Sequence, residues 1–168
     1  MNVLGIRVEP KIVHYTIIND RNEFIVDKLY VPINTGVPRR LSYIRSNLLS
    51  IVKENQISKI GLRVIESNAD LNTVQNVGER INIEGVIQEL MCDCNISVYR
   101  TFLKSQILKS LDLRERNILD DYLKAVSNYS PFGIDLEVWN RYSKNQKESL
   151  LVAFSVRGIE NDWNFIIE

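Results

Sequence analysis

The feature that most constrains the fold is a change in hydrophobic period after residue 31. Before that point, three apolar runs rich in β-branched and aromatic residues follow one another across short polar turns, at residues 3–9, 11–18 and 23–31. Such runs predict three strands, and the short turns between them predict an antiparallel meander. From Arg39 to Asn55 the apolar residues recur at helical spacing instead, so the meander should lead into a helix.

Helix and strand then alternate. The compact apolar run at 58–65 is typical of a buried parallel strand. A second helix is predicted at about 76–91, a short fifth strand at 96–99, and helices at 101–111 and 114–126. Each crossover helix should return the next strand parallel and right-handed. We therefore expect an α/β fold with a five-stranded mixed sheet, three antiparallel and then two parallel strands, flanked by helices on both faces.

The C-terminal third is less regular. The pattern breaks at residues 130–133, allows one or two helical turns at 135–142, and becomes a stronger helix at about 145–156. The hydrophobic tail 158–168 carries Trp163 and Phe165, which are costly to leave in water. We expect the tail either to pack on the sheet or to engage another chain.

Length and charge limit the classes of function. A chain of 168 residues without a linker or internal repeat predicts a single domain, residues 1–168. Its 21 basic and 21 acidic residues cancel, which argues against strong non-specific binding to nucleic acid but still allows a local basic patch. Neither a signal peptide nor a membrane-spanning run of about 20 apolar residues is evident, so we expect a cytoplasmic protein. Cys92 and Cys94 form a lone pair, too few ligands for zinc, and are expected to be reduced cysteines at a helix end.

Three segments carry a resemblance to a known family: Leu4-Gly5-Ile6-Arg7, Val64-Ile65-Glu66 and the helical run from Glu148 to Phe154. They resemble the RuvC-like branch of the ribonuclease H-like superfamily, which includes Holliday-junction resolvases and bacterial relatives. The resemblance implies the ribonuclease H-like sheet and a nuclease that cleaves phosphodiesters with two Mg²⁺ or Mn²⁺ ions held by carboxylates. Residues 112–144 match nothing in the family and are expected to be a helical insertion.

Arg7 departs from the family pattern at its central position. The resemblance implies an aspartate there, bridging both metal ions, and a guanidinium has donors only. We therefore expect no metal, and we expect Arg7 to act as a built-in counter-ion for Glu66, Glu148 or both. Asn145 lies one helical turn before Glu148, where a further acid could stand.

An active enzyme remains the alternative. Strand alternation would put Glu9 on the same face as Arg7, so Glu9, Glu66 and Glu148 could hold Mg²⁺ or Mn²⁺. The resemblance also implies a substrate-binding role for Lys104, which follows the fifth strand. Structural interpretations compete with these: Glu66 would simply cap a strand end and face solvent, and Glu148 would complement a helix dipole from its first turn.

Two other features have a structural and a functional interpretation. His14, the only histidine, is expected to be packed in the core or to lie on an edge strand, with a proton-shuttle role as the alternative. Gly78-Glu79-Arg80 stands near a helix start, but one glycine is not a phosphate-binding loop.

The function we favour is a catalytically degenerate module of bacterial or phage origin that acts by binding. It would be a subunit of a nucleic-acid-processing or defence assembly, with a protein partner expected and nucleic acid as a further ligand. The oligomeric state is left open, a homodimer included. A sugar-kinase-like or actin-like phosphotransferase would need a glycine-rich phosphate loop and a second domain, and the sequence offers neither.

Overall fold

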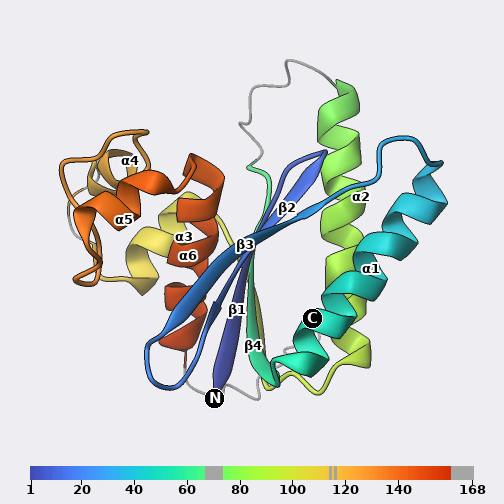
Figure 1. The fold of residues 1–168 in the computed structure, drawn as a ribbon, viewed down its shortest axis with the longest axis horizontal. Coiled ribbons are helices and arrows are strands. Elements are labelled where there is room, and N and C mark those ends of the chain that lie inside the picture. Colours follow the sequence, from blue (N-terminus) through green and yellow to red (C-terminus); the bar gives the residue numbers. More distant parts are fainter. Residues whose placement is uncertain (67–73, 114, 116, 160–168) are drawn as a thin grey trace.

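The computed structural model describes residues 1–66, 74–113, 115 and 117–159. Three strands come first, and helices and strands then alternate, in the predicted order (Figure 1). The strands are β1 (Asn2–Val8), β2 (Ile12–Ile18), β3 (Phe24–Tyr30), β4 (Ile57–Arg63) and β5 (Val98–Phe102). The helices are α1 (Val37–Glu54), α2 (Val74–Leu90), the short 3₁₀ turn η1 (Met91–Asp93), α3 (Lys104–Ser110), α4 (Ile118–Tyr122), α5 (Leu136–Arg141) and α6 (Lys144–Arg157).

The sheet has the order β3-β2-β1-β4-β5 and is mixed as predicted. The first three strands pair antiparallel, whereas β4 lies parallel to β1 and β5 parallel to β4. In this register Arg7 at the end of β1 lies opposite His14 on one side and Arg63 on the other. Three ionisable side chains, one each from β2, β1 and β4, therefore lie in one row across the sheet at the carboxyl end of β1.

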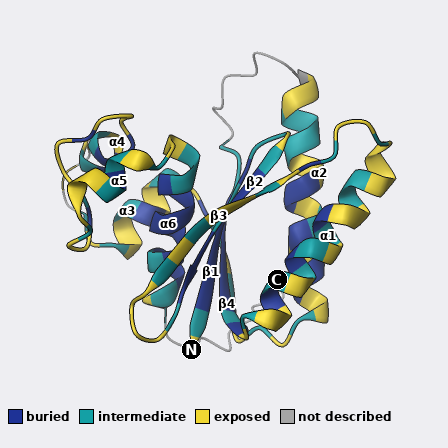
Figure 2. Ribbon diagram, in the orientation of Figure 1, coloured by how far each residue is buried: buried dark blue, intermediate teal, exposed yellow. Residues whose placement is uncertain are grey.

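Helices cover both faces of the sheet (Figure 1). On one face, α1 and α2 pack over a core that includes Leu4, Ile6 and Ile60. On the other face, α6 packs against β1, β2 and β4, and most of its residues are buried (Figure 2). Because β1 and β4 are covered on both sides, their residues are buried almost continuously rather than at every second position.

Two glycines allow α6 to approach the sheet closely. A Cβ atom on Gly5 would lie 2.2 Å from the Ser149 carbonyl oxygen and 2.4 Å from the Ala153 nitrogen. A Cβ atom on Gly61 would lie 2.6 Å from a methyl carbon of Val152. The backbone of α6 therefore rests directly on β1 and β4, and Ser149 donates or accepts a 2.8 Å hydrogen bond with Thr16 of β2. This close packing fixes where Glu148 lies.

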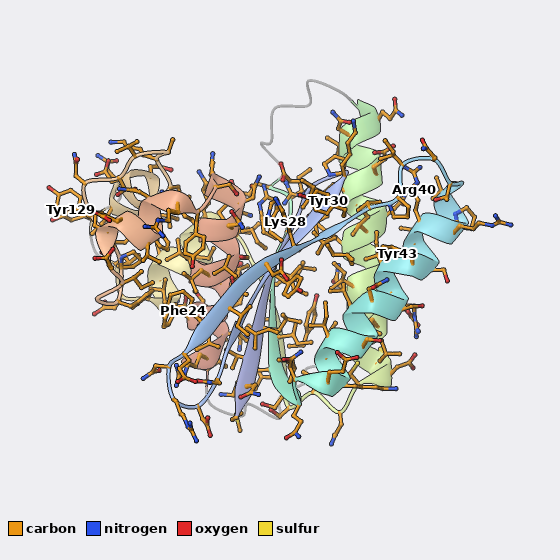
Figure 3. All side chains as sticks on the ribbon, viewed as in Figure 1. Phe24, Lys28, Tyr30, Arg40, Tyr43 and Tyr129 are labelled. Atoms are coloured by element: carbon orange, nitrogen blue, oxygen red, sulfur yellow. The ribbon has the colours of Figure 1, made fainter. Side chains whose placement is uncertain are left out.

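Helices α3, α4 and α5 share one hydrophobic cluster with α6. Tyr129, between α4 and α5, lies exposed on the outside of this part of the molecule (Figure 3). The predicted helix at 114–126 is wrong in extent, because α4 covers only Ile118–Tyr122. Beyond Tyr122 tertiary hydrogen bonds replace helical ones. The Lys124 carbonyl accepts from the buried Lys147 ammonium at 2.6 Å, and the Ser127 amide donates to the Asn140 side chain at 2.8 Å.

The predicted boundaries of the fifth strand are also wrong. It spans Val98–Phe102 rather than 96–99, because it pairs with β4 as far as Arg63, beyond the point where Arg100 interrupts the apolar pattern. Cys92 and Cys94 are free and lie at the end of α2, as expected. Of the tail, Trp163 and Phe165 fall outside the described residues. Within the described part of the chain, no helix is both long and apolar enough to span a membrane.

Candidate functional site

Arg7 lies at the carboxyl end of β1 and forms an ion pair with Glu148 of α6. Its Nε atom is 2.6 Å from Glu148 Oε2, and the two side chains are only 13% and 4% exposed. Arg7 also donates a 3.0 Å hydrogen bond from Nη1 to the Val8 carbonyl. Glu148 lies in the second turn of α6 rather than the first, so the helix-dipole explanation for this residue is wrong. Its environment is a buried cation.

A second arginine, Arg63 at the end of β4, approaches the same glutamate. Its Nε atom lies 3.7 Å from Glu148 Oε2, and its Nη2 atom donates a 2.9 Å hydrogen bond to Glu66. Burial lowers the pKa of Arg63, the charge of Glu148 opposes this, and the charge of Arg7 adds to it. Glu148 thus faces two guanidinium groups, one from each central parallel strand.

Glu66 follows β4 and is held by two donors. It accepts hydrogen bonds from Arg63 and from the Lys104 backbone amide, each at 2.9 Å. Although burial raises the pKa of Glu66, the Lys104 amide and the Arg63 charge together lower it. Lys104 therefore meets the site through its backbone, while its ammonium points to Asp120 at 3.2 Å.

A third arginine–glutamate pair comes from α2. Arg80 Nε lies 2.6 Å from Glu84 Oε1, and the Glu84 carboxylate also accepts from the Ile65 amide at 3.2 Å. Burial lowers the pKa of Arg80, and the charge of Arg7 lowers it further. Arg7, Arg63 and Arg80 are therefore close enough to repel one another, with Glu148, Glu66 and Glu84 as their counter-ions.

Glu9 lies just beyond β1 and pairs with the buried His14 of β2. The His14 Nε2 and Glu9 Oε2 atoms are 2.5 Å apart. The hydrogen bond with His14 is the main cause of the lowered pKa of Glu9, and a hydrogen bond from Asn145 contributes. His14 is thus packed within the sheet as expected, on an inner strand rather than an edge strand.

These groups surround a pocket of about 370 Å³ at the carboxyl end of β1. Three cations from three elements line it, Arg7, Arg80 and Lys144, together with the carboxylate of Glu9. Its remaining lining residues are Val8, Pro10, Ile65, Asn76, Val77 and Asn145. Glu66 and Glu148 are not among the residues that line it; they lie behind Arg7 and Arg63.

The donor set does not fit a divalent cation. Magnesium and manganese need several oxygen ligands around one point, and guanidinium groups offer none. Glu148 points at Arg7 and Arg63, and Glu66 points at Arg63. Among the described residues, no three His, Cys, Asp or Glu side chains are arranged to hold a metal ion.

The structure brings together Arg7, Glu148, Glu9 and Asn145, four residues that the sequence analysis had named. Glu66 does not contact Arg7 but is connected to Glu148 through Arg63, which contacts both acids. Sequence reasoning did not find Arg63 or Lys144, and it set Arg80 aside. An arginine in the buried run of β4 was the available signal for Arg63, because such a charge requires a partner. The i, i+4 spacing of Arg80 and Glu84 was the signal for their pair.

Comparison with known proteins places this architecture. No protein-family model and no curated protein sequence matches the chain. Solved structures do: Thermus thermophilus RuvC matches with a TM-score of 0.64 at 10% identity, over 94% of each chain. The same protein in complex with a Holliday-junction substrate matches with a TM-score of 0.61 at 11% identity, again over 94% of each chain. The chain has a RuvC-like ribonuclease H-like fold.

A third match supports that assignment. The yeast mitochondrial Holliday-junction resolvase Ydc2 aligns with a TM-score of 0.56 at 13% identity, over 93% of this chain and 77% of that one. At these low sequence identities the similarity establishes the RuvC-like fold but not the activity, which has to be argued from the residues of the site. The predicted fold class is confirmed, including the three antiparallel and two parallel strands.

Proposed function

We propose that this RuvC-like protein is a catalytically degenerate module that acts by binding, as a subunit of a cytoplasmic nucleic-acid-processing or defence assembly. The observation that carries the proposal is the ion pair of Arg7 with Glu148, 2.6 Å apart and nearly buried. In this interpretation the cation takes the place of metal ions and holds the glutamate in a fixed position. The site would then stabilise a binding surface instead of activating water.

The second arginine supports the proposal independently. Arg63 lies 3.7 Å from Glu148 and 2.9 Å from Glu66, so each of the two acids nearest Arg7 and Arg63 is already neutralised by a cation. Binding a divalent ion at this point would require both arginines to move away. Such a movement would leave two guanidinium groups buried without a partner, which would destabilise the protein.

An active metal-dependent endonuclease is the second candidate, and one observation favours it. The Glu9 carboxylate lines the pocket and its lowered pKa keeps it charged at neutral pH. It is the one carboxylate among the lining residues of the described chain. In that case Glu9 would have to recruit Glu66 and Glu148 from their arginine partners.

A cleavage assay with a thermal measurement tests the two candidates. The wild-type protein is incubated with branched, single-stranded and hybrid substrates in manganese, beside a Glu66→Gln control. We expect no cleavage by either protein. The melting temperature should not change when manganese is added, because no metal ion binds at the site. Cleavage that the control lacks, or a melting temperature that rises with manganese, would establish the enzyme instead.

The binding role requires a partner. The solved RuvC structure in complex with a Holliday junction suggests branched nucleic acid as the first ligand to test, and a protein partner is sought by affinity capture from the native host. Light scattering of the purified chain would show whether it is a homodimer. A chain that captures neither nucleic acid nor protein would contradict a binding role.

A further inference from the structure

We propose that the pocket lined by Arg7, Arg80 and Lys144 binds a phosphate group of a nucleic-acid strand directly, without a metal ion. The inference deepens the proposed function and rests on it, because a pocket that held metal ions would bind phosphate through them. It assigns a ligand chemistry to the pocket at the carboxyl end of β1.

The charges of the lining residues carry the first step. Three cations from β1, α2 and α6 line the pocket, against one carboxylate, Glu9. The Glu9 carboxylate is itself paired with His14, whose Nε2 atom lies 2.5 Å from Glu9 Oε2. Arg7 and Arg80 are each fixed by a glutamate on their inner side, so their orientation is set before any ligand arrives. Fixed guanidinium groups are well suited to phosphate oxygens.

Lys144 supplies the most available charge. Its side chain is exposed, and in the described part of the chain its ammonium makes no ion pair or hydrogen bond. It is the first residue of α6, where a cation is unfavourable for the helix because the dipole already places positive charge there. A lysine at that position therefore adds to an attraction for anions that the helix end exerts on its own.

Two helix ends meet at this pocket. The first turn of α2 contributes Asn76 and Val77, and the first turn of α6 contributes Lys144 and Asn145. Neither first turn contains an acidic residue, although acids are the usual complement of a helix start. Backbone amides at a helix N-terminus bind phosphate readily, so the two ends reinforce the side-chain cations.

Arg80, which lines the pocket, has a buried hydrogen-bond donor that is not used within the described residues. The donor is Arg80 Nη2, which is buried and has no hydrogen-bond partner among the described residues. Burial is the main cause of the lowered pKa of Arg80, and repulsion from the charge of Arg7 is the second. An anion between these two side chains would relieve that repulsion. The pocket volume of about 370 Å³ lies within the range of small-ligand sites, large enough for a phosphate with its sugar.

Two-dimensional amide NMR of the whole chain, titrated in EDTA, tests the site directly. The probes are inorganic phosphate, a thymidine dinucleotide with only its internal phosphodiester, and the same dinucleotide with an added terminal phosphate. We expect saturable shifts of the Asn76, Val77 and Asn145 amides. A stronger response to the terminal phosphate identifies a strand end as the ligand, and an equal response to both dinucleotides identifies the strand backbone.

A matched pair of lysine variants tests the charge. Lys144→Gln should weaken binding of a labelled single strand about fivefold, as expected for loss of one solvent-exposed charged contact. The log–log salt dependence should become shallower by about 0.7. Lys53→Gln is the control, because Lys53 is also exposed on a helix but lies in the last turn of α1, outside the pocket. It should bind like wild type, and a loss equal to that of Lys144→Gln would overturn the proposal.

The outcomes separate this inference from the proposed function. Pocket amides that do not move with any probe in EDTA, while manganese leaves the protein inert, would refute the phosphate site alone. Amides that move only when manganese is present, together with a rise in melting temperature, would refute both. Shifts in EDTA that vanish in Lys144→Gln and persist in Lys53→Gln support the site.

Discussion

Replacing Arg7 by glutamine should destabilise the protein by leaving Glu148 as a buried charge with one distant partner. Breaking a buried ion pair costs about 3–5 kcal/mol. Arg63 Nε remains 3.7 Å from Glu148 and compensates in part, so we expect the lower end of that range, about 3 kcal/mol. For a domain of this size, that corresponds to a fall in melting temperature of about 6–12 °C.

A double-mutant cycle separates this interaction from general damage at residue 7. Glu148→Gln removes the buried negative charge, and the double variant removes both charges together. We expect the double variant to be more stable than Arg7→Gln alone, with a coupling energy of at least about 1.5 kcal/mol. Urea unfolding followed by circular dichroism measures all four proteins. The reasoning is refuted if Arg7→Gln costs less than about 1 kcal/mol, or if the two changes are additive within about 0.5 kcal/mol.

Further predictions concern packing and pH. Gly5→Ala should cost about 3 kcal/mol or more in urea unfolding, because the added Cβ would lie 2.2 Å from a backbone oxygen of α6. Gly78→Ala is its control and should stabilise α2 by about 0.5–1 kcal/mol, since nothing lies within 4 Å of the added carbon; equal effects at the two glycines would rule out the close approach. His14 lowers the pKa of Glu9, so the stability from this carboxylate is present above pH 4.5 and is lost as the pH falls through its lower folded value. Glu9→Gln should flatten the fall in unfolding free energy over that acidic range, and an unchanged pH profile would contradict the assignment.

The fold was predictable from the sequence because its hydrophobic period changes once and then alternates regularly. Element ends were less predictable where tertiary contacts decide them. The Lys124 carbonyl illustrates the point: Lys147, distant in sequence, takes the hydrogen bond that would have continued α4. A local pattern contains no record of such a partner.

The site was predictable only in part, for a related reason. The resemblance located Arg7 and Glu148, and the expectation that the arginine would meet an acid describes their contact correctly. It did not locate Arg63, because a single charge inside an apolar run looks like the edge of a strand. Nor did it reveal that Lys144 shares a pocket with Arg7, since only the packing of α6 on Gly5 brings them together.

Arg63 also bears on whether a metal ion could bind at this site. If Arg7 were the sole obstacle, Arg7→Asp would supply a carboxylate ligand at the end of β1. Arg63 would still lie 3.7 Å from Glu148 and 2.9 Å from Glu66, holding both remaining acids. The new aspartate would add a buried negative charge that one arginine cannot balance, and the variant should be less stable than wild type at neutral pH. A metal site here would therefore require changes at the ends of both parallel strands, which makes the arginine pair, rather than Arg7 alone, the unit that defines this site.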